Sequence, residues 1–173
     1  IHIKKEDIHL QPQVFKQILK VGFPVAIQDG CIQIAFIIIT IIANSRGLND
    51  AAAVGIVEKM ITAIFIIPST MLATVSALSA QNIGAKDYGR ARTVLKYAVM
   101  ITTLYGIIVA LIIEFCAPTL LGLFTKDTTV ILLGVQYISS YIIDTIFAGI
   151  HFSFSGYFAS DGKSYIGFIH NII

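Results

Sequence analysis

Long apolar runs separated by short polar connections constrain the fold of this chain more than any other feature. Between Lys20 and Arg46 the only charged side chain is Asp29. About 20 apolar residues in an α-helix cross the roughly 30 Å hydrocarbon core of a bilayer. A helix also satisfies its own backbone hydrogen bonds, as lipid requires. The sequence therefore predicts an all-α, polytopic transmembrane helix bundle.

Composition supports the same class. Of the 173 residues, 56% are hydrophobic and 13% are charged, and the mean hydropathy is +0.83, which is too apolar for a soluble domain of this size. The net charge is only +2, and the basic side chains fall in connections, so we expect no nucleic-acid partner. Cys31 and Cys116 lie in apolar runs and are expected to be small core residues rather than a disulfide or a metal pair.

We expect a polar, cytoplasmic lead-in segment over residues 1–17 and a transmembrane helical lobe over residues 18–173. The lobe should contain four complete spans and the start of a fifth. Pro68 should kink the second span. Both ends read as cut points, so we expect a piece of a longer protein. The predicted helices cover about 18–44, 52–82, 93–124, 128–159 and 163–173.

A polar joint at Ala80–Lys96 separates the second and third spans and carries four basic side chains against one acid, Asp87. Lys and Arg are frequent in the lead-in, rare in the next connection, frequent in the joint and rare again after it, which places the lead-in and the joint in the cytoplasm. Gly84 and Gly89 are expected to supply the turn. The composition suits a bacterial inner membrane, so a multi-pass plasma-membrane protein is predicted. The loop motif of this joint consists of Gln81, Asn82, Gly84, Ala85, Arg90 and Arg92.

Polar side chains recur at helical spacing on the first and fourth spans. Asp144 falls at the centre of its helix, and Asp29 falls within about a turn of the centre of its own. An Asp at a helix centre costs on the order of 2.5 to 3.5 kcal/mol on insertion, so both acids require a reason. The candidate ion-binding or substrate-binding residues on these two stripes are Asp29, Gln33, Gln136, Ser140, Asp144 and His151.

Two interpretations of the acids remain open. In a structural one, Asp29 hydrogen-bonds to a neighbouring hydroxyl and Asp144 to His151. In a functional one, the carboxyls line a water-filled cavity, where a desolvated acid exchanges a proton or binds Na⁺, and Na⁺ is the metal considered at Asp144. Asp144 is the stronger candidate because its stripe is the more polar.

Missing features narrow the chemistry. The sequence has no GxxxxGK[ST] phosphate-binding loop, which argues against an ATP-driven motor in this chain. The charges at mid-membrane depth are acidic, whereas a flippase for anionic lipid-linked sugars is expected to use Lys or Arg there. His151 and Ser155 stand four residues apart as a hydrolase dyad would, but no third group supports one, so no enzyme is predicted. No cofactor is expected beyond a coupling ion, Na⁺ or H⁺.

Four segments, in order and spacing, resemble the second half of the MATE family of multidrug and toxin extruders. The resemblance implies a twelve-helix transporter of two six-helix lobes, with these spans as the seventh to tenth helices and the start of the eleventh, packed against an N-terminal lobe. The QNIGA element with its following basic residues is the most specific part. The four segments are GFPVAIQDG (22–30), AAAVGIVEKM (51–60), SALSAQNIGAKDYGRAR (76–92) and APTLLGLFTKD (117–127).

The resemblance implies a secondary active antiporter that expels cationic or amphipathic drugs in exchange for Na⁺ or H⁺ by alternating access. Asp144 resembles the acid of the tenth helix, while the acid that some members carry on the seventh helix would stand about where Ile32 and Gln33 are here. The alternatives are a lipid-linked oligosaccharide flippase of the same wider superfamily and a non-transporting membrane scaffold. Drug-stimulated ion flux would exclude the scaffold, and translocation of lipid-linked sugars would favour the flippase.

Overall fold

The computed structural model describes the protein from residue 12 to residue 172. Every regular element in this part of the chain is helical, which confirms the all-α prediction. Four of the helices are long and apolar enough to cross a membrane. The helices are α1 (Pro12–Arg46), α2 (Leu48–Gly84), α3 (Tyr88–Leu121), α4 (Thr128–Ser160) and α5 (Ser164–Ile172).

Several helices are longer than the sequence pattern indicates. Helix α1 begins at Pro12 rather than at about residue 18, so the described part of the predicted lead-in is helical, and residues 1–11 lie outside the described residues. Proline suits a first helical position because its missing N–H would have no partner there. Helix α3 begins at Tyr88 rather than at about residue 93, because the Asp87 carboxylate accepts a hydrogen bond from the Arg90 N–H at 2.9 Å.

The polar joint between α2 and α3 is correspondingly short, and only residues 85–87 stand outside the two helices. Its tight turn is made by Lys86, which has a φ of 62°, and not by Gly84 or Gly89. This left-handed conformation costs more free energy for a lysine than for a glycine. Of the predicted loop motif, Ala85 alone lies in the connection; Gln81, Asn82 and Gly84 end α2, and Arg90 and Arg92 open α3.

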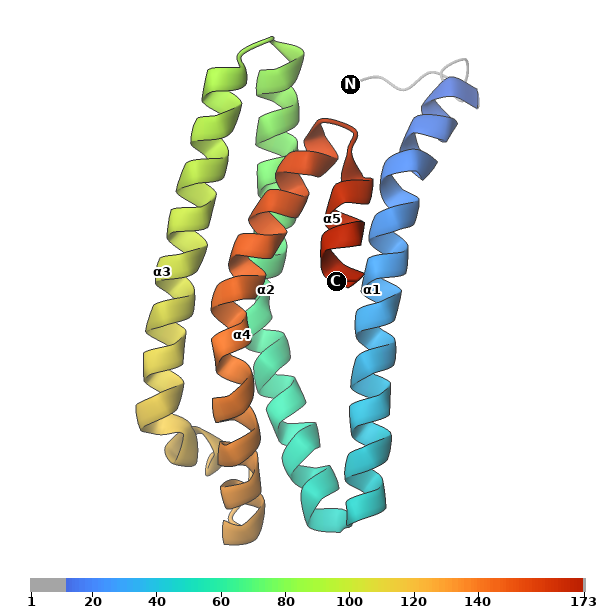
Figure 1. The fold of residues 1–173 in the computed structure, drawn as a ribbon. Coiled ribbons are helices and arrows are strands. Elements are labelled where there is room, and N and C mark those ends of the chain that lie inside the picture. Colours follow the sequence, from blue (N-terminus) through green and yellow to red (C-terminus); the bar gives the residue numbers. More distant parts are fainter. Residues whose placement is uncertain (1–11, 173) are drawn as a thin grey trace, which may run out of the picture.

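The helices run up and down, so the connections alternate between two ends of the molecule (Figure 1). The start of α1, the α2–α3 joint and the α4–α5 connection lie at one end, and the α1–α2 and α3–α4 connections lie at the other. The first end carries the four basic residues of the joint, whereas Arg46 and Lys126 lie at the second. This arrangement matches the predicted alternation of basic charge.

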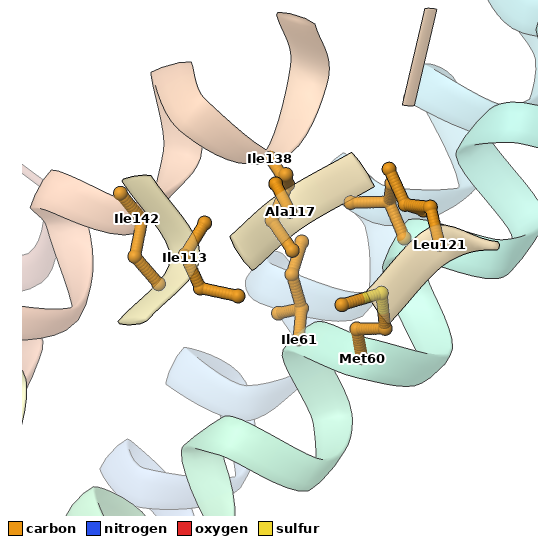
Figure 2. Packing of buried hydrophobic residues seen from close by; sticks show 8 residues of the cluster. Met60, Ile61, Ile113, Ala117, Leu121, Ile138 and Ile142 are labelled. Carbon is orange, nitrogen blue, oxygen red and sulfur yellow. The ribbon is translucent and has the colours of Figure 1, made fainter. Parts of the chain in front are cut away.

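Helix α4 is the central element and packs against both α2 and α3. Glycines on α4 permit the close approach: a Cβ atom at Gly156 would lie 2.5 Å from the Leu72 carbonyl oxygen of α2, and one at Gly149 would lie 2.8 Å from the Thr102 Cβ of α3. Where larger side chains meet, they form the apolar core (Figure 2). This core consists of Val57, Met60, Ile61, Ile113, Ala117, Leu121, Ile138 and Ile142.

Pro68 lies fully buried inside α2, which continues through it and changes direction along its length (Figure 1). Proline has no N–H, so the carbonyl of Ile64, four residues earlier, loses its helical hydrogen bond. The Tyr105 hydroxyl of α3 donates a hydrogen bond to that carbonyl at 2.9 Å. A tertiary contact thus replaces the backbone bond that the proline removes, as apolar surroundings demand.

We predict that Tyr105→Phe lowers the free energy of unfolding of the full-length protein by about 0.5–1 kcal/mol, the value of one hydrogen bond in such surroundings. The loss should shrink in a Pro68→Ala background, because residue 68 then supplies the missing N–H to Ile64. Denaturant unfolding in detergent measures both effects, with Tyr97→Phe as a control at an exposed tyrosine of the same helix. Equal losses in the two backgrounds would contradict the role assigned to Tyr105.

Candidate cation and substrate cavity

A cavity of about 1100 Å³ lies among α1, α2, α4 and α5. Its wall is mostly apolar and aromatic with a few polar groups, which is the usual character of a small-molecule site. Neither Lys nor Arg contributes to this wall among the residues that the structure describes. The polar and charged residues that line the cavity are Asp29, Gln33, Thr62, Ser69, Tyr141, Asp144, His151 and Ser155.

The two cavity acids each lie at the middle of a long helix. Asp29 is the middle residue of α1, which runs from Pro12 to Arg46, and Asp144 is the middle residue of α4, which runs from Thr128 to Ser160. Both line the cavity, and both side chains are exposed in it. The structure therefore brings together two carboxyls that the sequence predicted at mid-membrane depth on separate helices.

Neither acid has a hydrogen-bond partner or an ion-pair partner among the side chains that the structure describes. The one ion pair there joins Lys163 to Asp161 in the α4–α5 connection, where the hydrogen bond to Asp161 raises the pKa of Lys163. Asp144 and His151 interact electrostatically but are not hydrogen-bonded to each other. The hydrogen bond to His151 that the structural interpretation assigned to Asp144 is therefore not formed.

A hydrogen-bonded group joins α1 to α4 at the cavity wall. The Gln28 side-chain amide lies 3.2 Å from His151 Nε2, and the Ser155 hydroxyl lies 3.3 Å from the same nitrogen. Gln28 is only 4% exposed, and Ala43 is the one other buried residue in the described part of α1. Since so little of α1 is buried, this contact is a major part of its attachment to α4.

Sequence reasoning missed Gln28. The polar stripe predicted for α1 ran through Asp29, Gln33 and Thr40, of which Asp29 and Gln33 line the cavity. A neighbouring face runs through Gln28, Ile32 and Phe36 to the same Thr40 at four-residue spacing, and its side chains make hydrogen bonds to other helices. The four-residue spacing between Gln28 and Thr40 could have indicated that Gln28 faces other helices. The two residues between them on that face are apolar, so the face did not stand out as polar.

The remaining candidates on α4 lie apart from the cavity. Gln136 and Ser140 are both exposed and do not line it, and the Ser140 hydroxyl donates to the Gln136 carbonyl at 2.9 Å within the helix. His151 and Asp144, further along the same helix, do line it. The structure therefore gathers Asp29, Gln33, Asp144 and His151 out of the predicted set.

Aromatic rings line one part of the wall. The centroid of the Tyr141 ring lies 6.3 Å from that of Phe36 on α1 and 6.0 Å from that of Phe65 on α2. These three residues, called here the aromatic cluster, all line the cavity. Aromatic faces attract cations and also bind flat apolar groups. The wall therefore offers apolar and aromatic surface beside two acids.

Four membrane-length helices, three of which line a cavity together with the short α5, define a multi-pass membrane protein with a ligand-sized site. Residues 24–173 match the family model described as MatE, and the chain belongs to this family of membrane transporters, which is not a family of enzymes. It is also 22% identical over 120 residues to a protein of Bacillus subtilis (strain 168) named probable multidrug resistance protein YoeA. The match covers 69% of this chain but only 26% of that protein.

We predict that water reaches the cavity side of α1. In full-length protein with Cys31→Ser and Cys116→Ser, a cysteine at Gln33 should react with a charged, membrane-impermeant thiol reagent on the order of tenfold faster than one at Ile34, because only the thiolate reacts and lipid suppresses it. Ile34 is 57% exposed but does not line the cavity, which makes it a matched neighbour. Equal labelling rates would contradict a hydrated cavity at this position.

Proposed function

We propose that this chain is one lobe of a secondary active multidrug antiporter, which expels organic cations and other amphipathic compounds in exchange for Na⁺ or H⁺. The observation that carries the proposal is the pair of acids, Asp29 and Asp144, in a cavity lined by aromatic rings. Membership of the MatE family supports transport. Similarity to a Bacillus subtilis protein named as a probable multidrug resistance protein supports drug efflux.

The cavity accounts for selection of the cargo. A large apolar wall binds compounds of varied shape through the hydrophobic effect, and the aromatic cluster adds cation–π attraction. The two carboxyls make the site favourable for positive charge, and neither Lys nor Arg lies in the described wall to oppose them. Anionic cargo would meet only repulsion at these acids, so lipid-linked sugar phosphates are the poorer match.

The same acids supply the coupling. A carboxyl that holds a proton or Na⁺ no longer attracts a cationic drug, so the ion and the drug compete for Asp144. His151 interacts electrostatically with Asp144 from two turns along α4, so its protonation adds to this competition. Ion binding and drug binding then favour opposite states of the alternating-access cycle, in which this lobe rocks against an N-terminal lobe.

We predict that Asp144→Asn abolishes ion-driven drug efflux in the full-length protein. The amide keeps the size of the side chain but neither exchanges a proton nor carries the charge that competes with the drug. The measurement is ethidium efflux from reconstituted vesicles under an imposed Na⁺ or H⁺ gradient. Loss of efflux under the gradient that drives the wild type identifies both the coupling residue and the ion.

Two matched variants sharpen this test. Glu114→Gln neutralises an exposed acid of α3 that does not line the cavity, and it should leave efflux at the wild-type rate. Asp29→Asn neutralises the second cavity acid. A smaller loss of efflux in this variant than in Asp144→Asn would show that Asp144 contributes more to coupling than Asp29. Unchanged efflux in a folded Asp144→Asn protein would refute the assignment of Asp144.

A further inference from the structure

The imidazole of His151 is held at one ring nitrogen from two sides. The Gln28 amide of α1 lies 3.2 Å from Nε2, and the Ser155 hydroxyl, one turn along α4, lies 3.3 Å from the same atom. Both partners are nearly buried, at 4% and 8% exposure. The ring is therefore part of the cavity wall but is anchored through one nitrogen to two protein side chains.

Helix α5 limits the position of the Ser155 hydroxyl. Gly167 of α5 is buried and lines the same cavity. A Cβ atom at this position would lie 2.9 Å from Ser155 Oγ and 3.3 Å from Ser155 Cβ, closer than such atoms normally approach. A serine hydroxyl turns easily about its Cα–Cβ bond, so a larger residue at 167 would first displace the hydroxyl from its place beside His151.

Contacts with two neighbouring helices keep α5 in this place. It packs against both α1 and α4 and lies between them in Figure 1. At its first residue, the Ser164 hydroxyl donates a hydrogen bond to the Lys20 carbonyl oxygen of α1 at 3.4 Å, and Ser164 is buried. Helices α1, α4 and α5 therefore each contribute one contact to the support of His151.

The direction of this ring matters for the charge in the cavity. His151 stands seven residues, about two helical turns, from Asp144 on α4, and the two side chains interact electrostatically. Such an interaction weakens as the two groups move apart, so a ring that turns away from Asp144 changes the field that a cationic cargo meets. A histidine side chain has two rotatable bonds, and contacts to the ring are what fix them.

We propose that Gln28 and Gly167 are positioning residues for His151, which fix its imidazole at the cavity wall from α1 and from α5. Gln28 does not line the cavity, so it acts on a bound compound only through the ring. Gly167 acts through the Ser155 hydroxyl, whose position its backbone limits. The contacts themselves stand on the structure, and only their consequence for transport rests on the proposed function.

Nitrogen-15 NMR of the histidine side chains, recorded on the full-length protein in vesicles, tests the positioning. The signals that disappear in His151→Gln identify the ring. Gln28→Met keeps a side chain of similar length but removes the amide, and Gly167→Ala adds the Cβ atom that displaces the Ser155 hydroxyl. Both variants should shift the Nε2 signal of His151, because each removes a hydrogen-bond partner of that nitrogen.

The matched control is Gly55→Ala, at an exposed glycine of α2 where an added Cβ atom would have no neighbour within 4 Å. It should leave the Nε2 signal unchanged. A signal that stays unchanged in Gln28→Met, or that moves as far in Gly55→Ala, would overturn the proposal. If Gly167→Ala fails to insert, Ser155→Ala removes the same hydroxyl without adding an atom, and the Nε2 signal must shift there too.

A double-mutant cycle on ethidium efflux separates positioning of His151 from a general structural role. Gln28→Met should lower the efflux rate about threefold to tenfold, the equivalent of one hydrogen bond. In a His151→Gln background the same substitution should have no further effect, because the ring that it positions is gone. Equal effects in the two backgrounds would overturn the positioning role. Absence of ethidium efflux in the wild type would refute the proposed function, while the NMR shifts would still decide the positioning of His151.

Discussion

The requirement that every backbone polar group find a partner within the protein governs this lobe. Apolar spans meet it by folding as helices, and where Pro68 breaks the pattern, Tyr105 of a neighbouring helix donates to the freed Ile64 carbonyl. At the start of α4, the Asp127 carboxylate accepts hydrogen bonds from backbone N–H groups of the first turn, which have no partner within the helix. The Asp87 carboxylate does the same for α3. The long helices and short connections both follow from this requirement.

Packing divides the lobe into a firmly held part and a lightly held part. Helices α2, α3 and α4 meet through close glycine contacts and the apolar core, whereas α1 has only Gln28 and Ala43 buried among its described residues. The side-chain hydrogen bonds that join α1 to α2 and α4 run to Glu58 and His151, and both partners are titratable.

The sequence was sufficient for the number of membrane-length helices and for the position of each cavity acid at the middle of its helix, because apolar length and position along the chain determine both. It was insufficient to predict the length of the joint between α2 and α3 or the residue that makes its turn. The Asp87 cap extends α3 into the basic stretch, and Lys86 makes the turn. It also missed Gln28 and Glu58. Which face of a helix is buried depends on its rotation about its own axis, and nearly uniform apolar surroundings leave that rotation unmarked in the sequence.

The placement of the acids explains why the lobe can keep unpaired carboxyls in a membrane. Asp29 and Asp144 occupy the middle residues of helices that are held mainly by other contacts, α4 by its glycine faces and α1 by its packing against α2 and α5. Neither acid bonds to another described side chain, so its protonation or ion binding changes no packing contact directly. Glu58 differs because its hydrogen bond is itself a contact between α1 and α2.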